Sequence, residues 1–189
     1  MAVLFTSDWC VPAARELAEL LREPGPDTPV WTWSAERTSG FWLRTQLIEP
    51  AVHRWDAPST TGTPGPLDPA VAADAVTRTF EVMALARRAW KAAPAGPGER
   101  YRFRRTDGPE TRTVVFAPDE VRLEPGSTTP EPGVVDPESG PTAPADVEAA
   151  GTASDLALFL WRRLPATAPR ATAGDAALLP RWFTLVPPV

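Results

Sequence analysis

Apolar residues at helical spacing near the start of the chain predict an amphipathic helix over residues 11–22. Pro12 suits the first turn of this helix, where a missing backbone donor costs little. The segment that follows, EPGPDTP, breaks the pattern, so we expect the helix to end there. The apolar positions of this first helix are Ala14, Leu17, Leu20 and Leu21.

A second apolar stripe predicts a helix over residues 41–56. Pro50 lies inside this stripe, where its ring removes one backbone donor and clashes with the carbonyl group of Gln46. We therefore expect the helix to bend or break near Pro50. Residues 59–67, rich in proline and glycine, are typical of a linker, so the helical region would occupy residues 1–58.

Asp68 and Pro69 mark the start of a third helix, which should run to about Trp90. Three strands should follow, over residues 100–106, 111–116 and 120–123. In the first of them, Tyr101 and Phe103 alternate with arginines. This alternation favours an antiparallel strand with aromatic side chains in the core and arginines in water over an RNA-binding sheet.

The rest of the chain combines a loop with further strand and helix patterns. Residues 125–144 are rich in Pro, Gly, Ser and Thr and predict a disordered loop. We then expect a strand over 145–149, a helix from Thr152 or Ser154 to Leu164, and an apolar last helix over 175–186. Helices followed by a small sheet and more helices indicate an α+β fold, with a C-terminal domain over residues 68–189.

Composition narrows the function classes. The 189 residues include 43% hydrophobic residues and carry a net charge of −5, which argues against a nucleic-acid binder. The single cysteine excludes a disulfide within the chain. No run of about 18 apolar residues predicts a membrane span, and the first residues do not resemble a signal peptide. We therefore expect a cytoplasmic protein that works without a membrane.

The stretch EPAVHRWDA contains His53, the only histidine of the chain, four positions after Glu49. On a helix this spacing places both side chains on one face, with about 5–6 Å between their Cβ atoms. Such a pair can bind a metal ion, or it can be an ordinary pair on a helix surface. Catalytic zinc usually takes three protein ligands, and Cys10, Asp56, Asp8 or another carboxylate could be the third.

Two arginines and the cysteine are further candidates. Arg44 and Arg54 flank the Glu49–His53 pair and could hold a substrate carboxylate through a bidentate fork. They could equally pair with Asp56 or remain solvated. Cys10 precedes a predicted helix, which could lower the pKa of its thiol. A small buried residue is the more common explanation of a cysteine at such a position.

The segment PVWTWSAERTSGFWLRTQLIEPAVHRWDA, residues 29–57, resembles the signature of the mycothiol-dependent maleylpyruvate isomerase family. The segments ASDLALFLWRRLP and GDAALLPRWFTLVP resemble the C-terminal domain of the same family. This resemblance implies an α+β architecture, in which an incomplete DinB-like helical bundle precedes a small α/β domain similar to sterol carrier proteins.

The resemblance also implies a chemistry. Members carry a divalent metal, typically zinc, on an early histidine and on a Glu and His spaced like Glu49 and His53. Mycothiol is their thiol cofactor and a small unsaturated acid their substrate. The thiolate adds to maleylpyruvate, rotation follows, and the thiol leaves to give fumarylpyruvate. A related thiol transfer would use the same site.

The chain departs from the family pattern in ways that bear on activity. From the resemblance we expect the helices that supply the first histidine to be missing here, and Ile48 and Pro50 stand where members commonly have other residues. We therefore expect weak or absent metal binding by this chain as written. The alternative expectation is a metal-free binding or interaction module that self-associates as a homodimer.

Overall fold

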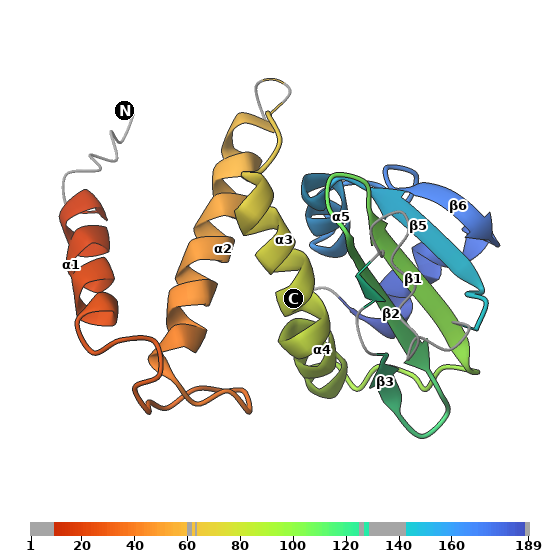
Figure 1. Ribbon diagram of the computed structural model, residues 1–189, viewed down its shortest axis with the longest axis horizontal. Coiled ribbons are helices and arrows are strands. Elements are labelled where there is room, and N and C mark those ends of the chain that lie inside the picture. The colour runs from red at the N-terminus through yellow and green to blue at the C-terminus, as the bar shows by residue number, and fades with distance from the viewer. Residues whose placement is uncertain (1–9, 60–61, 63, 125–126, 129–142, 188–189) are drawn as a thin grey trace, which may run out of the picture. The chain divides into compact units, whose positions relative to one another are not determined.

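The structure is a computed structural model that describes residues 10–59, 62, 64–124, 127–128 and 143–187 (Figure 1). The chain divides into two compact units, Met1–Pro50 and Ala51–Val189, which we call the N-terminal and C-terminal units. The sequence predicted that the helical region ends at residue 58, whereas the first compact unit ends at Pro50, inside α2. Each unit is described by itself.

The N-terminal unit contains helix α1 (Cys10–Arg22) and the first half of α2 (Ser39–Ser59). Helix α1 confirms the prediction for residues 11–22, and its Leu17 and Leu20 are exposed. The connection to α2 is ordered by a bridge between Pro29 and Thr38. An aromatic cluster then marks the start of α2, where Phe41 meets Trp33 edge to face with 4.8 Å between ring centroids.

Helix α2 runs without interruption through Pro50, so of the two predicted outcomes, a bend or a break, the break is excluded. Proline removes only one hydrogen bond, and the turns on both sides of it continue in this helix of 21 residues. Ile48 and Val52, before and after the proline, are both buried. Burial of these flanking side chains offsets the loss of a single backbone bond.

The C-terminal unit begins with the second half of α2 and continues with the long helix predicted to follow Asp68. This long helix consists of α3 (Pro69–Arg78), the π-helical turn η1 (Thr79–Met83) and α4 (Ala84–Trp90). An Asp68 side-chain oxygen accepts bonds from the backbone N–H groups of Ala70 and Val71 at 3.0 and 3.1 Å. The predicted cap is therefore confirmed.

The sheet has the strand order β3-β2-β1-β5-β6, with the short β4 paired to β2. Neighbours along this order are antiparallel except β1 and β5, which are parallel. The strands are β1 (Glu99–Arg105), β2 (Glu110–Phe116), β3 (Val121–Leu123), β4 (Ser127–Thr128), β5 (Val147–Gly151) and β6 (Arg170–Gly174).

Three of these strands match the prediction to within a residue at each end. Strand β5, the fourth strand predicted, begins two residues later than expected. Strand β6 was not predicted, because its residues are exposed and show no apolar alternation. Within the stretch expected to be a disordered loop, Ser127–Thr128 form β4, and residues 125–126 and 129–142 lie outside the described residues.

The alternation in β1 places Tyr101 and Phe103 in the core, as predicted. Arg102 and Arg104 lie on the other face of the strand, where both pair with Glu148 of β5. Helix α3 packs against α5 (Ala153–Leu160), which begins at the predicted cap Thr152 but ends before residue 164. Figure 1 shows these two helices together beside the sheet.

Trp182 is the centre of the core. Its side chain is fully buried, and its ring meets Phe103 and Tyr101 edge to face, with centroids 5.0 and 5.7 Å away. The single helix expected over 175–186 is wrong in detail: a 3₁₀ helix, η2 (Ala176–Arg181), precedes α6 (Trp182–Leu185). Pro180 lies inside the 3₁₀ helix and has no backbone N–H to donate.

None of the helices in the described part of the chain is long and apolar enough to cross a membrane.

Candidate functional site

His53 lies in the last turns of α2 with 64% of its side chain exposed. Its Nδ1 is 3.2 Å from Oδ2 of Asp56, which follows three residues later on the same helix. An imidazole whose Nδ1–H donates to a carboxylate presents the lone pair of Nε2. Metal-binding histidines in proteins are commonly held in this way. The geometry therefore suits His53 as a ligand through Nε2.

Asp56 is held in turn by Arg163, which follows α5 in the C-terminal unit. The Arg163 guanidinium donates from Nε to Oδ1 at 2.9 Å and from Nη2 to Oδ2 at 2.8 Å. The hydrogen bond from Arg163 is the main cause that lowers the pKa of Asp56 below its ordinary value, although burial opposes it. The same bond raises the pKa of Arg163. Asp56 thus remains an acceptor for the His53 ring.

Glu49 lies four residues before His53 on the continuous helix α2, so the two side chains share a face. In the described part of the chain, no three His, Cys, Asp or Glu residues gather closely enough to hold a metal ion. Asp8 and the side chain of Cys10 lie outside the described residues. The described residues thus fit a zinc centre only in part, because Glu49 and His53 could supply two of the three usual protein ligands.

The opposite face of α2 carries the two arginines considered for a substrate carboxylate. Successive residues of an α-helix are rotated by about 100°, so Arg44 and Arg54 point more than about 90° away from the Glu49–His53 face. Arg54 lines a cavity of about 300 Å³ together with Ala51, Trp55, Pro64, Gly65, Pro66 and Leu67. The structure therefore does not bring Arg54 and His53 into one site.

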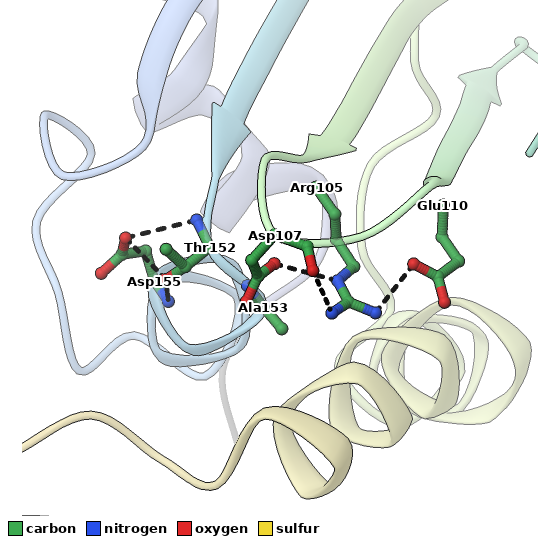
Figure 2. A network of polar contacts seen from close by, with 6 residues as sticks. All are labelled: Arg105, Asp107, Glu110, Thr152, Ala153 and Asp155. Carbon is green, nitrogen blue, oxygen red and sulfur yellow. Dashed lines mark hydrogen bonds and ion pairs between the residues drawn. The ribbon is translucent and has the colours of Figure 1, made fainter. Parts of the chain in front are cut away.

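A polar network fixes the start of α5, the helix that leads to Arg163. Figure 2 shows Arg105 between Asp107 and Glu110, with Nε–Oδ1 and Nη1–Oε2 distances of 3.1 and 2.7 Å. Asp107 also accepts the backbone N–H of Ala153 at 2.9 Å. Burial raises the pKa of Asp107, but the bonds from Ala153 and Arg105 outweigh it, and the pKa is lowered.

A capping box completes this network. The Thr152 hydroxyl accepts the backbone N–H of Asp155 at 3.1 Å, and the Asp155 carboxylate accepts the backbone N–H of Thr152 at 3.3 Å (Figure 2). The beginning of α5 is therefore fixed both by its own residues and by the turn between β1 and β2.

The sequence predicted a role for Glu49 and His53 but none for Arg163. The residues RR at 162–163 gave no local sign of which arginine turns toward Asp56, 107 positions earlier. Only the tertiary structure shows that Arg163 is the arginine that binds Asp56.

Comparison with protein families assigns both parts of the chain. The family model described as mycothiol maleylpyruvate isomerase N-terminal domain matches residues 6–58, and the one described as MDMPI C-terminal domain matches residues 70–181. The second match covers more than half of the chain. The chain thus belongs to the mycothiol-dependent maleylpyruvate isomerase family, and its fold is α+β with a DinB-like N-terminal domain. No curated protein and no solved structure matches it.

Proposed function

We propose that this protein is a mycothiol-dependent enzyme that isomerises a small unsaturated acid such as maleylpyruvate, or transfers the thiol to a related acid. The match of both domains to one family carries this proposal. In this reading a divalent metal, zinc by resemblance, would lower the pKa of the thiol when bound. Glu49 and His53 are its ligands from this chain.

The arrangement around His53 supports this role. Asp56 accepts from Nδ1 and so leaves Nε2 to bind the metal, while Arg163 holds Asp56 through two bonds. Asp56 and Arg163 are then positioning residues. Because the described residues supply two ligands, the proposal requires a further ligand from outside them, and binding by two ligands alone would be weak.

Zinc titration calorimetry tests the ligand assignment. We expect weak binding by the unaltered protein that is lost in both His53→Ala and Glu49→Ala, while Glu19→Ala, an exposed glutamate on α1, leaves it unchanged. Binding that survives His53→Ala would refute the assignment. An assay with mycothiol and maleylpyruvate tests the reaction itself, and the same variants should lower any isomerisation.

The positioning role has a separate test. Loss of a partner that orients a metal-binding histidine lowers metal affinity by about 10–100-fold. Arg163→Gln should therefore weaken zinc binding at a temperature where the protein stays folded. Its neighbour Arg162, which is exposed and lies over the Phe183 ring at 5.6 Å, provides the control Arg162→Gln. Equal zinc affinity in both variants would exclude the role of Arg163.

The second candidate is a metal-free interaction module that self-associates. It is favoured by the exposed apolar side chains Leu17 and Leu20 on α1, 40% and 60% exposed. Size-exclusion chromatography with light scattering should then show a dimer that dissociates in the double variant Leu17→Ser, Leu20→Ser. A monomer at all concentrations would remove this candidate.

A further inference from the structure

The cavity beside Arg54 has the composition of a small-molecule site. Its volume of about 300 Å³ lies at the lower end of the range of about 300–1,000 Å³ for ligand pockets. One wall is a single face of α2, formed by Ala51, Arg54 and Trp55, and the other is the segment of residues 64–67 before α3. Both walls belong to the C-terminal unit.

The two walls are anchored to the rest of this unit. The backbone N–H of Leu67 donates to the buried Ser154 hydroxyl at 2.9 Å, which ties the segment before α3 to the start of α5. On the other side, the bidentate bond from Arg163 to Asp56 holds the last turns of α2. A cavity held from both sides keeps its shape without a ligand, which lowers the entropic cost of binding.

The chemistry of the lining selects an anion with an apolar body. Among the seven described residues that line the cavity, Arg54 alone carries a charge, and the others are apolar or glycine. A guanidinium binds a carboxylate through two parallel N–H bonds. The indole ring of Trp55 and the proline rings offer flat apolar surfaces for the remainder of such a ligand.

We propose that this cavity is a binding site for a small organic carboxylate, with Arg54 on the carboxylate group and Trp55 against the apolar body. The site lies on the face of α2 opposite Glu49 and His53, so it is separate from the proposed metal ligands. The inference is independent of the proposed function.

Benzoate is a suitable probe, because it combines one carboxylate with one apolar ring, and benzamide is its neutral counterpart. Binding is measured by calorimetry and by saturation-transfer nuclear magnetic resonance on the full chain. We expect benzoate to bind, benzamide not to bind, and Arg54→Gln to weaken benzoate binding by roughly tenfold or more, the effect of losing a charged hydrogen-bond partner. Arg122→Gln removes the same charge from an arginine on β3 that is 57% exposed and should have no effect.

Two further variants locate the site. Ala51→Leu fills the cavity from the helix wall and should reduce benzoate binding even though it removes no charge. His53→Ala should leave benzoate binding intact, which separates this site from the proposed metal site. The proposal is overturned if the unaltered protein does not bind benzoate, if Arg54→Gln and Arg122→Gln behave alike, or if His53→Ala abolishes binding.

Discussion

Helices α1 and α5 differ in what surrounds their apolar residues. In α1, Leu17 and Leu20 are 40% and 60% exposed, whereas in α5 every residue from Leu156 to Leu160 is buried. Helix α5 has α3 packed against it, and its first turn is fixed by Thr152 and Asp107. An amphipathic pattern thus predicts a helix, but burial depends on partners from distant parts of the chain.

The largest difference between the two units should appear when a tryptophan is removed from each. Trp182→Ala leaves a cavity among four aromatic rings and should lower the free energy of unfolding by about 3–5 kcal/mol. Trp31, which is 72% exposed, is the matched control. Trp31→Ala should change the free energy of unfolding by less than about 1 kcal/mol. Urea unfolding followed by circular dichroism measures both. Similar losses would show that the core is not centred on Trp182.

Two glycines with positive φ sharpen the same comparison. Gly174 has φ 74° and a side chain there would overlap the carbonyl oxygen of Asp146, whereas Gly25 has φ 80° with nothing near it. Gly25→Ala should cost about 1 kcal/mol for the backbone conformation alone, and Gly174→Ala about 2 kcal/mol or more. Thermal unfolding ranks the two variants. The reverse ranking would contradict the close approach of β6 to Asp146.

The cap of α5 should have a moderate effect. Thr152→Ala removes the hydroxyl that accepts the Asp155 backbone N–H and should lower the free energy of unfolding by about 1 kcal/mol. Thr106→Ala, in the exposed turn after β1, changes the same chemical group and should have little effect. Chemical unfolding of both variants at neutral pH provides the measurement. Equal stabilities would argue against a capping role for Thr152.

The Asp56–Arg163 pair should produce the smallest effect, and one that depends on pH. The folded-state pKa of Asp56 is lowered, so its contribution is present above its unfolded pKa of about 3.9 and disappears as pH falls through the lower folded value. Asp56→Asn should therefore lose about 0.5–1 kcal/mol at neutral pH, because the pair is partly exposed.

Measuring the free energy of unfolding at acid pH tests whether the charged Asp56 carboxylate stabilises the protein. The difference between Asp56→Asn and the unaltered protein should shrink below about pH 4. Asp27→Asn, at an exposed position in the N-terminal unit, is the control and should show no such difference. A gap that stays constant down to strongly acid pH would mean that the carboxylate charge of Asp56 is not involved.

The sequence by itself determined the features that depend on neighbouring residues. The stripe of α1, the cap at Asp68 and the alternation in β1 are all local, because side-chain direction follows from the helical or extended backbone. The shared face of Glu49 and His53 belongs here as well, since it depends only on a spacing of four. So does the family resemblance, which rests on contiguous segments.

Only the tertiary structure decided the contacts between distant segments. The continuity of α2 through Pro50 depends on whether packing on both sides offsets one lost hydrogen bond. The parallel pairing of β1 with β5, the bond from Arg163 to Asp56 and the cavity at Arg54 each join residues far apart in the chain. Such contacts depend on the free energy of the whole packed unit, so they cannot be inferred from the spacing of neighbouring residues.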